Sequence, residues 1–290
     1  MDNMKATVKT FFKQFPSDDA CLTHLFHTRF GQGHECPTCK RSAKWYRIAG
    51  RPVFSCQHCG HHIHPMAGTL FEDSHTSLQS WFYAIYLFTT TRHGVSAKEL
   101  QRQLGVTYKT AWRMGHQIRK HMDKVNGNAP LSGIVEIDEV MVGGKRPGKR
   151  GRGADGKTTL LGMVERGGEM TVKAVPNVRR ETLLPIIEQN VAKGSEVHTD
   201  EFKSYSSLAS EGYGHRTVNH SKGQYAVAGC HVNSVEGFWF HLQKAIRGTH
   251  VWVSGKHLEK YAGEFAFRFN LRKAPASMFP ALVSSFLPLK

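Results

Sequence analysis

Three acidic residues stand on predicted strands or near the start of a predicted helix, where carboxylates can gather around a metal ion. Residues 135–139 alternate apolar and acidic side chains, so a strand would send Glu136 and Asp138 to one face. Asp200 ends a second short strand, and Glu236 lies on a later helix. Carboxylates on a half-buried face are costly unless a base or a cation compensates them. Three such acids can converge on a pair of Mg²⁺ or Mn²⁺ ions and cut a phosphodiester.

Four cysteines form a second group whose spacing is typical of a metal site. Two C-x-x-C pairs separated by sixteen residues match the four-cysteine zinc pattern, with Cys36, Cys39, Cys56 and Cys59. Four thiolates fill a tetrahedral Zn²⁺ site and leave no open position, which makes the ion structural. A redox dithiol would need only one pair. Cys21 and Cys230 lack partners at this spacing and are expected to be ordinary thiols. Neighbouring histidines can replace one ligand, namely His58, His61, His62 and His64.

The charge balance indicates a polyanionic partner. Lys and Arg number 39 against 23 Asp and Glu, which gives a net charge of +16. The sequence has no long Lys-rich amphipathic helix and no signal peptide, and its longest apolar block, residues 81–88, is far below the roughly 20 residues of a membrane span. We therefore expect a cytoplasmic protein with no membrane partner. Its six cysteines are then metal ligands or free thiols rather than disulfides.

Composition and apolar spacing divide the chain into five segments. The cysteine-containing segment has few aliphatic residues, so we expect it to depend on its metal to fold. The segments are a helical lead-in at 1–30, a zinc ribbon at 31–66, a helical DNA-binding segment at 74–124, an α/β domain at 130–273 and a Pro-containing tail at 274–290.

The α/β segment alternates strand-like and helix-like stretches. Their order indicates a mixed sheet with helices packed against it, and the Arg166-Gly167-Gly168 turn predicts a hairpin. We expect strands at 133–141, 158–165, 169–176, 196–199 and 215–219, and helices at 181–192, 201–210, 233–247 and 255–272.

Two short helices joined around Gly105 are typical of a helix-turn-helix, whose second helix enters the major groove of DNA. Ser96 and Glu99 match a capping box for the first helix, and Thr107 can cap the second. The alternative is a helical hairpin that only packs on the next domain. The candidate outward residues of the second helix are Tyr108, Lys109, Arg113, Gln117 and Arg119.

A basic, glycine-rich loop begins five residues after Asp138. Its cations suit a phosphate backbone, although a solvated loop that orders only on binding is compatible with the same composition. The loop is no P-loop, because the Gly-Lys-Ser/Thr ending on a helix is absent. Its candidate DNA-binding residues are Lys145, Arg146, Lys149, Arg150 and Arg152.

With these motifs in place, the chain resembles bacterial insertion-sequence transposases of the DDE class that carry an N-terminal zinc ribbon, the ISXO-like group. The resemblance runs from about residue 17 to 273. The matching strings are the two C-x-x-C pairs, Glu136-Ile-Asp138-Glu139 with Gly143-Gly144, Thr199-Asp200 with Tyr205, His231-Val-Asn-Ser-Val-Glu236-Gly-Phe-Trp, Lys244 with Arg247-Gly248-Thr249, and Glu264-Phe-Ala-Phe-Arg268-Phe-Asn270-x-Arg272.

The resemblance implies an RNase H-like catalytic domain with Asp138, Asp200 and Glu236 as the metal-binding acids. It implies metal-dependent hydrolysis at the ends of the element, followed by attack of the freed 3′-hydroxyl on target DNA. Some relatives place Asn at the third position, so Asn233 is a rival to Glu236. Lys244 and Arg247 are the counterparts of basic family residues; a phosphate contact is expected for Lys244, with a solvated lysine as the alternative.

Two other acids on the first strand compete with Asp138. The shorter side chain of Asp138 fits the family pattern better than Glu136 or Glu139. We expect Glu136 to pair with a nearby base or to support the site from behind. His198 and Glu201, which flank the second acid, are weaker candidates.

The resemblance, together with these motifs, implies a DNA transposase that binds the terminal repeats of an insertion sequence and works as a homo-oligomer on DNA. Two rivals use the same parts. One is a non-catalytic zinc-ribbon and helix-turn-helix binder, such as a decayed transposase or regulator. The other is an RNase H-like structure-selective nuclease, which would hydrolyse DNA without joining strands.

Overall fold

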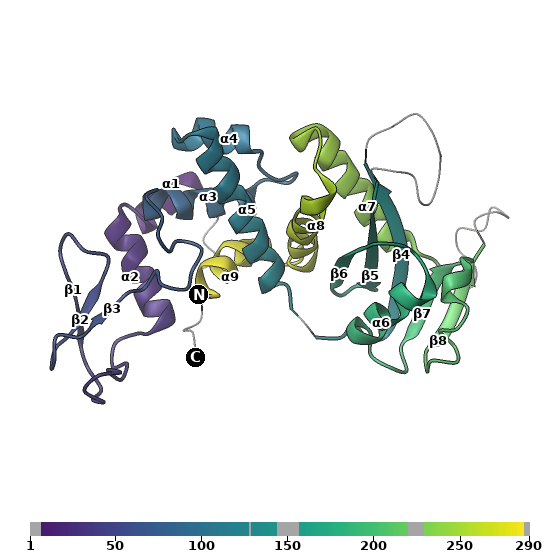
Figure 1. Ribbon diagram of the computed structural model, residues 1–290, viewed down its shortest axis with the longest axis horizontal. Coiled ribbons are helices and arrows are strands. Elements are labelled where there is room, and N and C mark those ends of the chain that lie inside the picture. Colours follow the sequence, from purple (N-terminus) through teal and green to yellow (C-terminus); the bar gives the residue numbers. More distant parts are fainter. Residues whose placement is uncertain (1–6, 128, 144–156, 220–228, 287–290) are drawn as a thin grey trace. The chain divides into compact units, whose positions relative to one another are not determined.

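The computed structural model describes residues 7–127, 129–143, 157–219 and 229–286, and its chain forms two compact units (Figure 1). The first unit takes in the chain up to His121 and the segment from Ala274 onward, and the second unit runs from Met122 to Lys273. None of the helices in the described residues combines the length and apolarity needed to traverse a lipid bilayer.

Helices from both ends of the chain build the core of the first unit. They are α1 (Val8–Gln14), α2 (Asp18–Arg29), α3 (Leu78–Thr90) and α9 (Met278–Ser284). Their contacts are largely aromatic: the Phe15 ring lies 5.0 Å from Phe82 and 5.7 Å from Phe279. The segment that we expected to be a tail therefore includes a helix, because Leu282 and Val283 of α9 are buried.

A small antiparallel sheet follows α2, in the order β1-β2-β3. Its strands are β1 (Trp45–Arg47), β2 (Phe54–Cys56) and β3 (His62–Ile63). The Phe54 ring stacks on Phe26 of α2 at 4.1 Å between centroids, so the sheet uses the helix as part of its core. This arrangement compensates for the few aliphatic side chains of the segment.

The predicted pair of short helices is present as α4 (Ala97–Leu104) and α5 (Tyr108–Val125). Ser96 caps the backbone N–H of Glu99, and Thr107 caps that of Thr110. Gly105 ends α4 in the left-handed conformation, with φ of +65°, which glycine adopts at little cost. The Glu99 side chain bonds to side chains one turn further along α4, rather than reaching back to complete the expected capping box.

The second unit is a five-stranded mixed sheet in the order β6-β5-β4-β7-β8. Neighbouring strands among β6, β5 and β4 are antiparallel, whereas β7 runs parallel to both β4 and β8. This is the RNase H-like α/β fold expected from the sequence, including the hairpin between β5 and β6. The strands are β4 (Ile134–Val142), β5 (Thr158–Glu165), β6 (Met170–Val175), β7 (Glu196–Asp200) and β8 (Gly214–Val218).

Helices cover both faces of this sheet. One apolar cluster joins one sheet face to α6 (Arg180–Asn190), and a second joins the opposite face to α7 (Asn233–Ala245) and α8 (Gly255–Asn270) (Figure 1). Period-two alternation assigns Val135 and Ile137 of β4 to the α6 face. Glu136 and Asp138 therefore point to the α7 face.

The helix predicted at 201–210 is wrong in type. The segment forms a short 3₁₀ helix, η1 (Lys203–Tyr205), followed by turns. Tyr205 and Leu208, three residues apart, are both buried against the α6 side of the sheet. Three-residue spacing matches the tighter 3₁₀ turn, in which side chains at i and i+3 eclipse.

Candidate active site and metal centres

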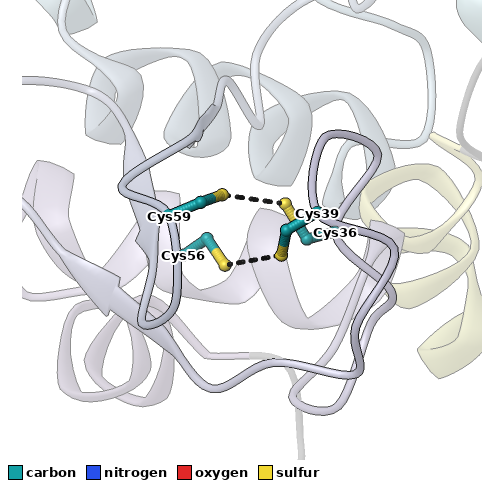
Figure 2. Close-up of side chains that lie close together, drawn as sticks. All are labelled: Cys36, Cys39, Cys56 and Cys59. Atoms are coloured by element: carbon teal, nitrogen blue, oxygen red, sulfur yellow. Dashed lines mark hydrogen bonds between the residues drawn. The ribbon is translucent and has the colours of Figure 1, made fainter.

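The four predicted cysteines meet at one point of the first unit (Figure 2). Their sulfur atoms all lie within 4.8 Å of one another, with Cys36 to Cys59 at 3.6 Å and Cys39 to Cys56 at 3.9 Å. A tetrahedral Zn²⁺ with Zn–S bonds of about 2.3 Å would hold its sulfurs roughly 3.8 Å apart. The donor set and its spacing fit structural zinc, and no histidine is needed as a ligand.

Each cysteine pair is held by the same tight turn. The backbone N–H of Lys40 donates to the carbonyl of Cys36 at 2.9 Å, and that of Gly60 donates to Cys56 at 3.1 Å. The residue after each pair has a positive φ, +57° at Lys40 and +72° at Gly60. Two equivalent turns therefore present two thiols each to a common centre.

The other two cysteines lie apart from this cluster. Cys21 and Cys230 are buried free thiols. Burial, followed by the charge of Asp18, raises the pKa of Cys21 to about 12, so this thiol stays protonated and inert at neutral pH.

The first two predicted acids occupy matched positions on neighbouring strands. Parallel pairing of β4 with β7 sets Glu136 opposite His198. The pairing ends there, and Asp138 and Asp200 each stand two residues further along their strands. The pairing partners Glu136 and His198 both contact Arg166, so they lie on one face of the sheet. Because side chains alternate along a strand, Asp138 and Asp200 point to that same face.

Helix α7 covers this face and brings Glu236 close enough to influence the charge of Asp138. The indole Nε1 of Trp239 donates to Oδ2 of Asp138 at 3.1 Å, and Glu236 stands one helical turn before Trp239. Gly162 of β5, paired with Asp138, makes this contact possible. A Cβ at Gly162 would lie 2.5 Å from the Trp239 ring, so any larger residue would displace the indole.

Burial and neighbouring negative charges set the electrostatics of Asp138. Burial, together with the negative charges of Glu139, Asp200 and Glu236, raises its pKa to about 7. A bound cation would oppose this effect by favouring the ionised form. The three acids are nevertheless less tightly gathered than the cysteines: among the described residues, only the cysteine cluster has three or more ligand atoms within 4.8 Å of one another.

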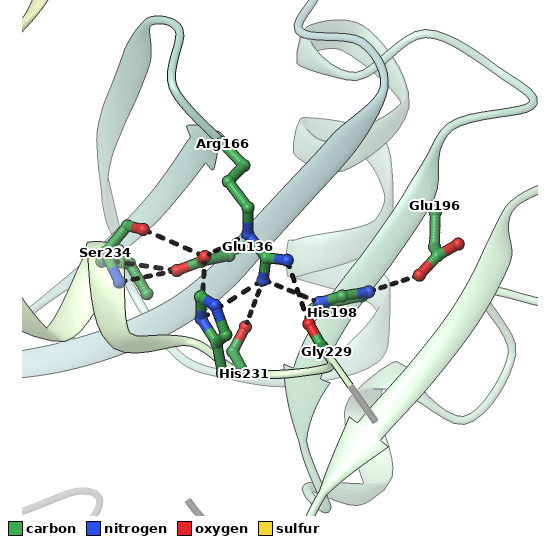
Figure 3. Close-up of polar contacts among 8 residues, drawn as sticks. Glu136, Arg166, Glu196, His198, Gly229, His231 and Ser234 are labelled. Carbon is green, nitrogen blue, oxygen red and sulfur yellow. Dashed lines mark hydrogen bonds and ion pairs between the residues drawn. The ribbon is translucent and has the colours of Figure 1, made fainter. Parts of the chain in front are cut away.

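Glu136 is engaged elsewhere and is fully buried (Figure 3). Its carboxylate accepts from Nε of Arg166 at 3.0 Å, and from the backbone N–H and hydroxyl of Ser234 at 2.7 and 3.0 Å. Ser234 lies in the first turn of α7, where backbone N–H groups lack helical partners and the helix dipole favours an anion. Glu136 therefore pairs with a base, as expected, and anchors the start of α7 to β4.

Arg166 extends this anchor to two further segments (Figure 3). Its guanidinium donates to the carbonyls of Gly229 and His231 at 3.0 and 3.2 Å, and its Nη2 lies 3.1 Å from Nδ1 of His198. The segment leading into α7 is thus held by the same guanidinium that neutralises Glu136. Sequence reasoning missed this role, because it assigned Arg166 only to a hairpin turn. A buried carboxylate is stable only with a compensating partner, but the sequence near Glu136 does not show which basic residue this is.

Glu139, the other competing acid, faces the opposite side of the sheet. Its carboxylate accepts from the Tyr205 hydroxyl at 2.6 Å, within the apolar cluster around α6. Burial and the Glu139 charge raise the pKa of Tyr205 well above its usual value, which keeps the hydroxyl a donor.

The two candidates for the third metal ligand both lie in the first turn of α7. Asn233 is its first residue, Glu236 follows three residues later, and both side chains are exposed. Exposure does not separate these two candidates.

The exposed face of α5 carries four of the five residues predicted to point outward, namely Tyr108, Lys109, Arg113 and Gln117. Arg119 was wrongly included. It is buried, donates to the Val95 carbonyl at 2.8 Å and lies over the Phe88 ring. Conversely, Trp112, which was not among the predicted outward residues, is 40% exposed. Its place four residues after Tyr108 is the signal that could have revealed a shared face.

The remaining basic candidates divide into two groups. Lys244 and Arg247 are exposed at the end of α7 and in the π-helical turn η3 (Ile246–His250). The predicted cations of the glycine-rich loop lie outside the described residues, namely Lys145, Arg146, Lys149, Arg150 and Arg152.

Comparison with known proteins gives two matching family models and two relatives. The ISXO2-like transposase domain matches residues 130–270, and the transposase zinc-ribbon domain matches residues 16–62. The chain is 28% identical over 285 residues to an uncharacterized protein in transposable element ISH50 of Halobacterium salinarum, which covers 91% of this chain and 94% of that protein. It is 36% identical over 96 residues to an uncharacterized transposase-like protein of Haemophilus influenzae, which covers 33% of this chain and 76% of that protein.

The two matched domains coincide with the two sites found in the structure. The zinc-ribbon match contains the cysteine cluster, and the transposase match contains the mixed sheet with its acidic face. Together they span well over half of the chain, and both imply binding to DNA. The chain therefore belongs to the ISXO2-like family of transposases, with a zinc ribbon ahead of the DDE transposase domain.

Proposed function

We propose that this protein is an active DNA transposase. It binds the terminal repeats of an insertion sequence, cuts a strand at each end and joins the freed 3′-hydroxyl to target DNA. Asp138, Asp200 and Glu236 hold the catalytic Mg²⁺ or Mn²⁺. The proposal is carried by the parallel pairing of β4 with β7, which ends at Glu136 and His198, two residues before Asp138 and Asp200, on the face covered by the helix that bears Glu236.

The residues around these acids prepare them for a cation. The Trp239 indole fixes the Asp138 carboxylate by a hydrogen bond, and the anchor formed by Glu136 and Arg166 fixes the start of α7. Carboxylate oxygens suit hard divalent ions, and their mutual repulsion disappears when a cation binds. When bound, a metal pair activates the attacking oxygen and stabilises the leaving oxygen of the phosphodiester.

DNA binding is assigned to several basic surfaces. The exposed face of α5, with Lys109 and Arg113, is proposed to read the terminal repeat together with the zinc ribbon. Lys244, Arg247 and the glycine-rich loop are proposed to hold phosphates near the cut. Because two ends must be joined, the protein acts as a dimer or larger assembly on DNA, and its chromosomal substrate places it in the cytoplasm with the nucleoid.

The deciding experiment incubates the purified protein with labelled DNA carrying the ends of the insertion sequence that encodes it. In Mg²⁺ or Mn²⁺ we expect nicks at the 3′ ends and then joined products. Asp138→Asn, Asp200→Asn and Glu236→Gln should abolish cutting while retaining DNA binding. Glu188→Gln, at an exposed carboxylate paired with Lys193, is the matched control and should cut normally.

Three outcomes separate this proposal from its rivals. Binding without any cutting by the unmodified protein would make it a non-catalytic DNA binder. Cutting without joined products would make it a structure-selective nuclease. If Asn233→Ala abolishes cutting and Glu236→Gln does not, the third ligand is Asn233.

A further inference from the structure

A pocket of about 280 Å³ lies between the end of β4 and the end of α7. Ligand pockets are commonly about 300–1,000 Å³, so this one suits a small, compact group. Its walls include Val142 and Gly143 on one side and Gln243, Arg247 and Trp252 on the other. None of the described residues that line it is acidic, which favours an occupant attached to an anion.

The wall that carries Trp252 is unusual in its backbone. Helix α7 continues into the π-helical turn η3, and Val251 follows with φ of +62°. A β-branched residue rarely adopts this conformation, and such strain is concentrated at functional sites. Beyond it, the Gly255 backbone lies so close to Thr158 that a Cβ there would be 2.3 Å from the hydroxyl. The segment is therefore fixed on both sides of Trp252.

The result of this geometry is an aromatic surface held in solvent. Trp252 is 63% exposed and Val251 is 80% exposed, although both are apolar. A flat indole beside an Arg guanidinium and a Gln amide offers a stacking surface together with hydrogen-bonding groups at the rim. A nucleobase has the matching features, a π face and a polar edge.

The pocket also lies at a suitable distance from the acidic face. Gln243 is seven residues after Glu236, which places it about 10 Å further along the same face of α7. On β4, Val142 is four residues beyond Asp138, roughly 13 Å along the strand. The two paths correspond to about three and about four nucleotide steps of roughly 3.4 Å. Arg247 and Lys244 are exposed beside this path and can bind the intervening phosphates.

We propose that this pocket, the Trp252 pocket, holds one unpaired nucleobase of bound DNA, stacked on the Trp252 indole. The base belongs to a nucleotide about three to four steps of roughly 3.4 Å from the strand position held at the acidic face. This placement rests on the proposed transposase function, whereas the capture of an unpaired base does not. Stacking tolerates every base, so the pocket selects an extrahelical nucleotide rather than a sequence.

The test compares binding of the full chain to two DNA duplexes of the same sequence, one fully paired and one with a single bulged adenine. Binding is measured without added Mg²⁺ or Mn²⁺ and without a chelator, so that cutting does not interfere and the zinc ribbon keeps its ion. Base stacking on an aromatic side chain supports a preference for the bulge of about tenfold. Trp252→Ala should reduce the ratio to near one, and Trp252→Phe should retain part of it.

A matched control is available on α5. Trp112 is also an exposed tryptophan, so Trp112→Ala should leave the ratio unchanged even if it weakens binding to both duplexes. A bulged 5-iodouracil should crosslink to Trp252 on irradiation, which reports contact independently of affinity. Circular dichroism checks that each variant is folded, and the exposure of Trp252 makes its replacement tolerable.

Three results would overturn the proposal. The first is equal binding of both duplexes by the unmodified protein, and the second is a crosslink that maps away from Trp252. The third is a Trp252→Ala variant that keeps the ratio but loses self-association, which would assign the pocket to a second copy of the chain. Failure here is distinct from failure of the proposed function, because Asp138→Asn should lose cutting and keep the bulge preference.

Discussion

The cysteine cluster of the first unit and the acidic face of the second unit are both candidate cation sites, and they are built differently. The cysteines span residues 36–59 and are presented by two equivalent turns. The acids come from two strands and a helix, and Asp138 and Glu236 are separated by almost a hundred residues. A short loop can close around an ion unaided, whereas distant carboxylates need a folded scaffold to bring them together.

The scaffold of the acidic face is a buried polar network. Glu136 and Arg166 fix the start of α7, and Gly162 makes room for the Trp239 ring over β5. Among the residues that the structure describes, no such network surrounds the cysteine thiols, and their own backbone turns position them. Removing the zinc should therefore unfold the zinc ribbon, whereas the acidic face should keep its shape without Mg²⁺.

The largest expected effect is the loss of a zinc ligand. Cys36→Ser or Cys56→Ser should reduce bound zinc from about one ion per chain to none, because structural zinc contributes about 10–16 kcal/mol in zinc-finger peptides. Zinc content by mass spectrometry and thermal unfolding of the full chain check this. Cys21→Ala, at a buried thiol outside the cluster, should keep its zinc. If the Cys36→Ser protein keeps its zinc and melts normally, the ribbon does not depend on this site.

The second expected effect breaks the scaffold of the acidic face. Glu136→Gln leaves the Arg166 charge without its counter-ion and weakens the α7 anchor, at a cost of about 3 kcal/mol. Denaturant unfolding should show the loss in the second unit, and zinc content should be unchanged. Glu188→Gln removes an exposed ion pair with Lys193 and should cost less than about 1 kcal/mol. Equal stabilities of these two variants would contradict the role given to Glu136.

The third effect concerns the pH dependence of stability in the protein without bound Mg²⁺ or Mn²⁺. The pKa of Asp138 rises from 3.8 to about 7 on folding, so the folded state binds its proton more tightly than the unfolded chain. The stability contributed by this group is complete below about pH 4, falls as pH rises toward 7, and then levels off. The slope is roughly 1.4 kcal/mol per pH unit at most.

Calorimetry of the protein without added Mg²⁺ or Mn²⁺, between pH 4 and 8, checks this expectation by following the unfolding of the second unit. Asp138→Asn should stabilise the second unit at pH 8 and have little effect near pH 4. Adding Mg²⁺ at pH 8 should raise the melting temperature of the unmodified protein more than that of Asp138→Asn. If the difference in stability between Asp138→Asn and the unmodified protein is the same at pH 4 and pH 8, this account is wrong.

The smallest expected effect tests the two turns of the cysteine cluster. Gly60 has φ of +72° and open space where a Cβ would stand, so Gly60→Ala should cost about 1 kcal/mol from backbone strain alone. Lys40 already bears this strain at φ of +57°, so Lys40→Gly should recover up to about 1 kcal/mol. Melting of the zinc-loaded protein measures both. If both substitutions raise the melting temperature, or both lower it, the two turns are not equivalent.

Much of the fold could be predicted from the sequence, because its signals are local. The strand β5, the hairpin to β6 and the caps at Ser96 and Thr107 each depend on neighbouring residues. Segments that depend on distant contacts were less predictable. Residues 201–210 form turns because Tyr205 and Leu208 pack on the sheet, and α9 forms because Leu282 is buried in a core built mainly from the other end of the chain.

The spacing of the cysteines determined the zinc cluster by itself, since four ligands within two short turns leave few other arrangements. Alternation along β4 determined that Glu136 and Asp138 share a face, because successive side chains of a strand point to opposite sides. Only the tertiary structure decided which acid is neutralised, that Arg119 faces inward and that Trp239 reaches Asp138. Each of these outcomes depends on a partner that is distant along the chain. The distance to that partner and the burial of the pair set the electrostatic energy, and no local pattern in the sequence identifies the partner.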